Sequence, residues 1–135
     1  MTLPVTAFVA AICALMLLIT AIDTVRQRMR AKAPFGDNAD QKLISASRSH
    51  GNLAEHAPIV ILLLAFLEMS RANHMVLMAI GALFLAGRVS HIFGLYAPMS
   101  TKPPLARSVG VIATWIVLAF LSGWTLFMLA TLNRG

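Results

Sequence analysis

The sequence has 135 residues, of which 59% are hydrophobic and only 12% are charged, whereas a typical soluble domain carries about 25% charged residues. Its mean hydropathy is +0.79. These values exclude a disordered chain and an ordinary soluble enzyme. The single cysteine, Cys13, excludes an internal disulfide framework. We therefore expect a small all-α integral membrane protein with one domain over residues 1–135.

The first hydrophobic stretch runs from Val5 to Ile22 without a charge, and Pro4 precedes it at a position that suits a first helical turn. Its length approaches the roughly 20 apolar residues that cross a bilayer core as a helix. A cleaved signal peptide has basic residues before its hydrophobic run, whereas here the basic residues begin after it, at Arg26. We expect this helix to be retained in the membrane.

Three further hydrophobic stretches follow, and each is long enough to span a bilayer. They cover residues 43–67, with the strongest part at 57–67, then 75–95, and then about 105–132. The connection between the first two helices is expected over residues 26–41, where Pro34 and Gly36 favour a loop. These spans predict a bundle of four transmembrane helices.

Basic residues are distributed unevenly between the two ends of these spans. The positive-inside rule places the richer end, which holds the first and third connections, in the cytoplasm, and both termini outside it. This rule accounts for most of the basic excess, so we expect lipid headgroups and not nucleic acid as its partner. The basic residues of the richer end are Arg26, Arg28, Arg30, Lys32, Lys42, Arg48, Lys102 and Arg107, and those of the other end are Arg71 and Arg134.

Polar residues form two stripes within the hydrophobic spans. Arg48, Asn52 and Glu55 have the spacing i, i+4 and i+7, which places them within about 60° of one another around a helix. Arg88 and His91 have the spacing i and i+3 near the end of the third span. A charge at the centre of a spanning helix costs about 2.5–3.5 kcal/mol on insertion scales. These residues therefore need a specific explanation.

The two stripes are expected to meet Arg107 on the cytoplasmic side, because the fourth helix begins there. The cations then outnumber the single carboxylate of Glu55, and this excess favours an anionic ligand. A structural alternative remains open. In it, Arg48 and Arg107 extend to the interface while Arg88 forms an ion pair with Glu55.

The remaining charged residues suggest local ion pairs. Glu68 and Arg71 have the spacing i and i+3, and so do Asp23 and Arg26, which allows each pair to meet on a helix surface. His50, His56 and His91 form no HxxH or HxxxH pair, so we expect no metal site.

Two segments resemble a known family. Residues 48–58 read RSHGNLAEHAP and resemble the R-x-H-x-N-x-x-E-x-x-P signature of the membrane-associated proteins in eicosanoid and glutathione metabolism, the MAPEG family. Residues 87–95, GRVSHIFGL, resemble its R-x-x-H motif in the third helix. Arg107 and Ser108 resemble the start of the fourth helix, and Phe35-Gly36-Asp37 is similar to the bacterial branch.

This resemblance implies a homotrimer of four-helix bundles that binds glutathione between subunits near the cytoplasmic face. A lipophilic second substrate would enter from the bilayer. Three features differ from the family pattern. His56 follows Glu55, where several members carry a tyrosine, and the loop over residues 96–106 is a little longer. A tyrosine commonly ends the third-helix motif, whereas Leu95 stands at that position and Tyr96 follows it. The resemblance assigns glutathione binding to Arg48, Asn52, Glu55, Arg88 and His91, with Arg26 from a neighbouring subunit, and stabilisation of the thiolate to Arg107.

The leading hypothesis is therefore a glutathione-dependent transferase or peroxidase of the bacterial inner membrane that acts on hydrophobic electrophiles. The alternative is a non-enzymatic protein of the same fold that binds a lipid or an anionic ligand. A proton-coupled exporter is disfavoured, because residues 5–22 contain no carboxylate that could carry the proton.

Overall fold

The computed structural model describes residues 2–98 and 102–132, and it confirms the four expected helices. Their bounds are α1 Pro4–Arg30, α2 Gln41–Met69, α3 His74–Tyr96 and α4 Leu105–Leu132. No strand occurs among the residues described. All four helices are long and apolar enough to cross a membrane. The all-α class and the four-helix membrane architecture are thus confirmed. Arg134 lies outside the described residues.

The boundary between α1 and the first connection differs from the expectation. The helix continues through Arg26 and Arg28 to Arg30, and only residues 31–40 form the connection. Arginine is a good helix former, and basic side chains near the carboxyl end of a helix interact favourably with its dipole. The chain leaves the helical conformation before Pro34, and Lys32 has a φ of 49°.

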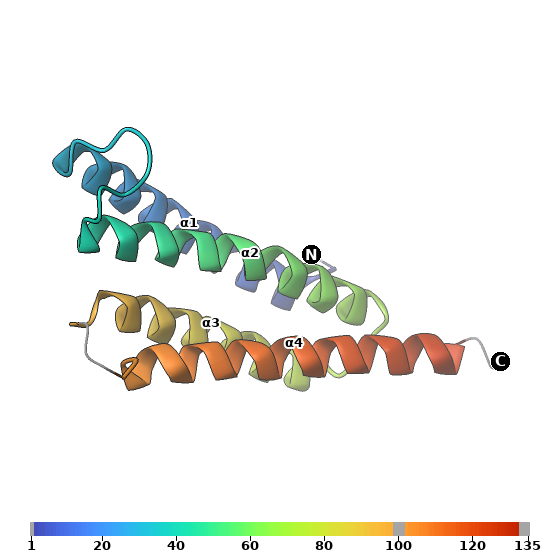
Figure 1. Ribbon diagram of the computed structural model, residues 1–135. Helices are drawn as coiled ribbons and strands as arrows, with labels where there is room; N and C mark the ends of the chain where they lie inside the picture. Colours follow the sequence, from blue (N-terminus) through green and yellow to red (C-terminus); the bar gives the residue numbers. More distant parts are fainter. Residues whose placement is uncertain (1, 99–101, 133–135) are drawn as a thin grey trace.

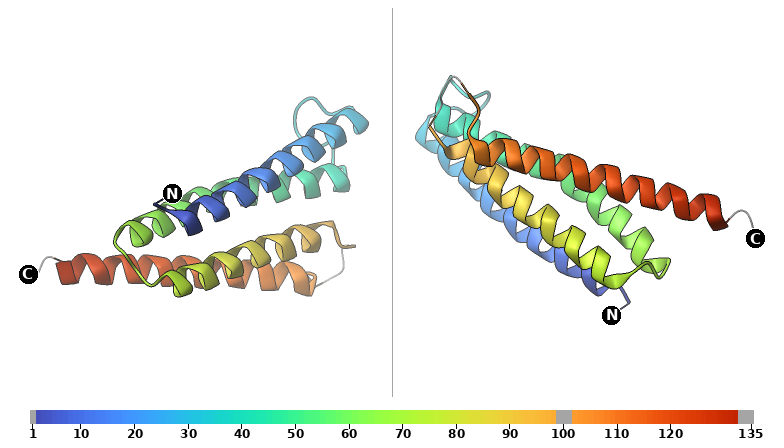
Figure 2. Two further views of the ribbon diagram at one scale, coloured as in Figure 1. Left: turned by 180° about the vertical axis from the view of Figure 1, so that it is seen from behind. Right: turned by 90° about the horizontal axis from the view of Figure 1, so that it is seen from below.

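The helices form two antiparallel pairs that lie one above the other (Figure 1). One pair is α1 with α2, and the other is α3 with α4. Figures 1 and 2 show that the pairs come together near the α2–α3 connection and diverge toward the end that holds residues 31–40. Helix α4 extends past the beginning of α3 (Figure 1).

One face of each helix supplies the core between the pairs. On α2 this face includes Leu53, Val60, Leu64 and Leu67, with spacings of seven, four and three residues that keep them on one side of a helix. The opposite faces expose large apolar side chains, as expected for helices that face lipid chains. The core residues of the other helices include Val5, Val9, Cys13, Leu77, Phe84, Val117 and Leu121.

A carboxylate ties α2 to the beginning of α1. Glu68 accepts hydrogen bonds from the Val5 N–H at 2.9 Å, the Thr6 N–H at 2.8 Å and the Thr6 hydroxyl at 2.7 Å, and His74 Nδ1 lies 4.0 Å from it. The first N–H groups of a helix have no partner within the helix, so they attract a carboxylate. The expected ion pair between Glu68 and Arg71 is therefore wrong.

A second acidic residue begins α2 at the other end. Asp40 accepts the Leu43 N–H at 2.9 Å as the N-cap, and Arg30 Nη2 donates to the same oxygen at 2.5 Å. The Leu43 N–H and the Arg30 guanidinium hold the pKa of the Asp40 carboxyl below its usual range. This contact joins the last turn of α1 to the first turn of α2.

Candidate functional site

The stripe on α2 faces away from the core of the subunit. Arg48 and Glu55 are exposed and Asn52 is half-buried, while Ser49 and Leu53 between them are buried. The predicted stripe is therefore present as a single polar face. It lies on the outer surface of one chain and not inside its bundle.

The position of Glu55 along α2 makes this exposure expensive. Glu55 is as far from Gln41 as from Met69, fourteen residues each way, or about 21 Å at 1.5 Å per residue. A charged side chain at the middle of a spanning helix, facing lipid, costs about 2.5–3.5 kcal/mol on insertion scales. Glu55 has no ion pair within residues 2–98 and 102–132. Among the described residues of one chain, the stripe therefore finds no ion-pair partner.

Arg88 lies inside the bundle, 2% exposed. Its Nη2 donates to the Gly110 carbonyl at 3.1 Å and to the Thr114 hydroxyl, while its Nε has no hydrogen-bond partner. The guanidinium carbon lies 5.9 Å from the centroid of the Phe84 ring, which supplies a weak cation–π contact. The structural alternative in which Arg88 pairs with Glu55 is wrong, because Arg88 bonds α4 instead.

His91 and Arg107 are brought together by close packing of α3 against α4. A Cβ built on Gly110 would lie 2.6 Å from the His91 Cβ, and one built on Gly94 would overlap the backbone of Arg107. Glycine is required at both positions because any side chain would separate the helices.

The structure therefore divides the predicted site residues into two groups within one chain. Arg88 and His91 are buried together between the helices, with Arg107 half-buried beside them. The outward group comprises Arg48, Asn52 and Glu55, and the exposed Arg26 lies near the end of α1.

Sequence reasoning missed two side-chain contacts, one of them made by a predicted site residue, Arg88. Thr114 receives the Arg88 hydrogen bond, and the Tyr96 hydroxyl donates to Asp23. Asp23 also accepts from Gln27 Nε2 at 3.1 Å, so the expected pairing of Asp23 with Arg26 is wrong. Successive residues of a helix lie about 100° apart, so Tyr96 faces a different direction from Leu95. This offset is the sequence feature that indicates that Tyr96 does not replace the tyrosine of the third-helix motif.

Arg107 also borders a hollow on the outer face of α4. This hollow has a volume of about 390 Å³, and its lining includes Val111, Ile112 and Trp115. It combines one guanidinium with an apolar wall. Such a surface suits an apolar molecule that reacts next to a positive charge.

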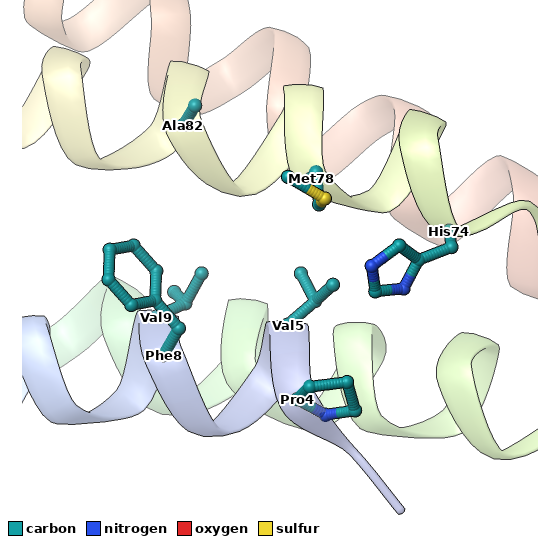
Figure 3. Close-up of a pocket in the computed structure, with 7 residues that line it drawn as sticks. All are labelled: Pro4, Val5, Phe8, Val9, His74, Met78 and Ala82. Atoms are coloured by element: carbon teal, nitrogen blue, oxygen red, sulfur yellow. The ribbon is translucent and has the colours of Figure 1, made fainter.

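An apolar hollow of about 270 Å³ lies at the opposite end of the bundle, between α1 and α3. Figure 3 shows Val5, Val9 and Phe8 on one side of it and Met78 on the other, with His74 at one edge. His74 is its only titratable lining residue.

Within the parts of the chain that the structure describes, no group of three metal-ligating side chains occurs.

Comparisons with known proteins give a family. The sequence model of the MAPEG family matches residues 6–127. Inner membrane protein YecN of Escherichia coli strain K12 is 37% identical over 114 residues, which cover 84% of this chain and 84% of YecN. YecN of Escherichia coli O6:H1 matches with the same identity and coverage. No solved structure matches significantly.

Proposed function

Because this chain belongs to the MAPEG family, we propose that it is a glutathione-dependent transferase or peroxidase that acts on hydrophobic electrophiles in a bacterial inner membrane. The observation that supports this proposal is the polar stripe Arg48, Asn52 and Glu55 on the outer surface of α2. The MAPEG family is associated with glutathione, and the relatives that match are named inner membrane proteins.

The stripe requires a partner that lipid cannot supply. Two charged side chains on the outer face of a spanning helix are stabilised when another polar surface covers them. A second copy of the same chain, as in a homotrimer, covers this face and excludes lipid. Arg26 of the neighbouring copy then approaches the stripe, and each site is completed only in the assembly.

The side chains of the stripe match the functional groups of glutathione. Arginine forks bind carboxylates, of which glutathione has two, while Glu55 accepts hydrogen bonds from its amino group and Asn52 both donates and accepts. Arg88 and His91 belong to α3 of the same subunit and are buried within its bundle. The buried Nε of Arg88 forms no hydrogen bond among the described residues and is available to such a ligand.

Arg107 is the proposed catalytic residue. A free thiol has a pKa near 8.5 and is mostly protonated at neutral pH, and an adjacent guanidinium stabilises the thiolate. In the transferase reaction the thiolate sulfur forms a bond to the electrophilic carbon, and the leaving group departs with the bonding electron pair. Val111, Ile112 and Trp115 beside Arg107 offer an apolar surface for that electrophile.

The test is thiolate formation in purified protein. Addition of glutathione is expected to produce the thiolate absorbance at about 240 nm at neutral pH. Arg48→Ala is expected to weaken glutathione binding by roughly tenfold to a hundredfold, because it removes a charge-assisted contact worth about 1.5–3 kcal/mol. Arg71→Ala, an exposed arginine at the opposite end of α2, is the control and is expected to bind normally.

The outcome separates the two functions. Binding without a thiolate signal and without turnover favours the alternative, a protein of the same fold that binds a lipid or an anionic ligand. Equal glutathione affinity in wild type and Arg48→Ala contradicts the position of the site. A monomer in a mild detergent, measured by light scattering, contradicts the site between subunits.

We also propose that both termini lie outside the cytoplasm, because the basic residues concentrate at the end of the bundle with residues 31–40. Reporter fusions after residue 32 and at the carboxyl terminus are expected to report opposite sides of the membrane. A cytoplasmic carboxyl terminus contradicts this orientation.

A further inference from the structure

An unpaired tryptophan lines the hollow beside Arg107. Trp115 is 64% exposed on the outer face of α4, and it lines the same hollow of about 390 Å³ as Arg107. Among the described residues, its ring forms no aromatic pair and its indole N–H forms no hydrogen bond. The second tryptophan of the chain differs, because Trp124 is half-buried and packs edge-on against Phe120, with ring centroids 5.6 Å apart.

The depth of Trp115 along α4 is unusual for an exposed tryptophan. It lies ten residues after Leu105, the first residue of α4, which is about 15 Å along the helix. Exposed tryptophans of membrane proteins are enriched at the two interfaces, where the indole N–H meets water. A helix of 28 residues is about 42 Å long and extends about 6 Å beyond each side of a bilayer core of about 30 Å. Trp115 therefore lies within the hydrocarbon region, and packing within its own subunit does not explain it.

Arg107 and Trp115 share one face of α4. Arg107, Val111 and Trp115 are spaced four residues apart, which turns each side chain by only about 40° from the one before. The eight residues from Arg107 to Trp115 correspond to about 12 Å along the helix axis. The hollow thus has a guanidinium toward the beginning of α4 and an indole deeper in the membrane, with the apolar Val111 and Ile112 between them in the sequence.

These two groups suit different parts of one molecule. A guanidinium stabilises the negative charge that develops where the thiolate reacts, whereas an indole ring packs favourably against another aromatic ring. A flexible alkyl chain gains little from an apolar wall, because the surrounding lipid offers the same contact. A rigid planar group gains the aromatic contact in addition and loses less conformational freedom on binding.

We propose that Trp115 determines the substrate class of the hollow, which is an electrophile with a planar aromatic group. This group binds against Trp115, at the opposite end of the molecule from the carbon that reacts beside Arg107. The inference rests on the proposed transferase activity, and it adds a residue that distinguishes aromatic from aliphatic electrophiles.

Two substrates with the same reactive ring test this selectivity. The 2-naphthyl and n-decyl esters of 4-chloro-3-nitrobenzoic acid have equal numbers of carbon atoms in their alcohol parts, but only the naphthyl group is planar. In each reaction the thiolate sulfur of glutathione forms a bond to the carbon that carries chlorine, and chloride departs with the bonding electron pair. The absorbance of the nitroaryl thioether product measures both reactions.

Substitution of the two tryptophans gives a matched pair. Trp115→Leu is expected to lower kcat/KM for the naphthyl ester relative to the decyl ester by about three- to tenfold, as loss of one aromatic contact does. The KM for glutathione is expected to match wild type. Trp124→Leu removes the other indole of α4, which does not line the hollow, and its ratio is expected to equal that of wild type. Each variant is compared on two substrates, so the fraction of folded protein cancels.

A binding measurement separates this inference from the proposed function. Trp124→Phe leaves Trp115 as the single tryptophan, and Trp115→Phe leaves Trp124. The fluorescence of each variant in nanodiscs is titrated with 2-naphthyl 3-nitrobenzoate, an analogue that has no chlorine and whose nitroaryl ring quenches tryptophan on contact. Quenching of Trp115 is expected to saturate, whereas quenching of Trp124 is expected to rise linearly with the analogue dissolved in the lipid.

Three results overturn the proposal. The first is quenching of Trp115 that rises linearly, as it does for Trp124. The second is a naphthyl-to-decyl ratio that is unchanged in Trp115→Leu while turnover persists. The third is an equal fall of this ratio in Trp115→Leu and Trp124→Leu. Saturable quenching of Trp115 without turnover of either ester supports the aromatic site and contradicts the proposed transferase activity.

Discussion

The backbone of Arg107 packs directly against Gly94, so closely that a Cβ on Gly94 would overlap the Arg107 amide nitrogen and Cα. Gly94 therefore fixes the distance between the end of α3 and the beginning of α4. Three residues further into each helix, His91 packs against Gly110, so His91 lies about one turn from Arg107 across the same contact. The proposed catalytic arginine is thus positioned by a residue that has no side chain.

This contact predicts a large effect of a small substitution. Gly94→Ala is expected to destabilise the protein by about 1–3 kcal/mol, because the added methyl group must displace the backbone of α4. Gly123→Ala is the control, since a Cβ at Gly123 meets nothing within 4 Å and alanine favours a helix over glycine by up to about 1 kcal/mol. Thermal unfolding in detergent micelles measures both. Equal stability of the two variants contradicts the close approach.

The buried hydrogen bond between Arg88 and Thr114 predicts a second difference. Thr114→Val is expected to cost about 1.5–3 kcal/mol of unfolding free energy, because the hydroxyl is bonded to a charged group. Thr125 serves as the control, since its hydroxyl donates only to the Leu121 carbonyl at 2.8 Å. Thr125→Val is expected to change stability by less than about 0.5 kcal/mol. Denaturant titration in mixed micelles compares them, and similar losses in both variants argue against a bond that holds Arg88.

The hydrogen bonds of Glu68 predict that its substitution destabilises the beginning of α1, although Glu68 itself belongs to α2. Glu68→Ala is expected to lose about 1–3 kcal/mol, because three donors at the beginning of α1 lose their acceptor. Arg71→Ala is expected to have little effect, since Glu68 bonds α1 instead. Hydrogen exchange of the Val5 and Thr6 amides is the direct measurement. Unchanged protection of these amides in Glu68→Ala contradicts the contact.

Arg107 predicts a change in the pH dependence of turnover. Its guanidinium remains charged at any relevant pH, so Arg107→Ala is expected to raise the pKa of the bound glutathione thiol while leaving binding largely intact. Arg107→Lys retains the charge without the planar fork and is expected to keep part of the activity. Turnover of a chromogenic hydrophobic electrophile between about pH 6 and 9 is the measurement. An Arg107→Ala profile that coincides with wild type removes Arg107 from the mechanism.

The hydrogen bonds of Asp40 predict that the stability of the folded protein decreases in acid. Its pKa is lowered in the folded protein, chiefly by the Leu43 N–H and then by Arg30. Its contribution is therefore fully present above the ordinary pKa of 3.8 and is lost as the pH falls through the lowered folded value. Asp40→Asn is expected to lower the Tm at neutral pH and to converge with wild type in acid. Asp37→Asn, an exposed residue of the same connection, is the control, and a constant difference between Asp40→Asn and wild type at all pH values counts against this contact.

The sequence alone determined the four helices and the face on which the polar stripe lies. Both follow from local rules, because about 20 apolar residues span a bilayer and the spacing of Arg48, Asn52 and Glu55 fixes their angle around α2. Only the tertiary structure decided the partners of the buried polar groups. Glu68 bonds residues 62 and 63 positions away, and Tyr96 bonds Asp23 across 73 positions. Such contacts depend on how the helices pack against one another, as the close approach at Gly94 and Gly110 also does between α3 and α4, and local periodicity carries no information about that packing.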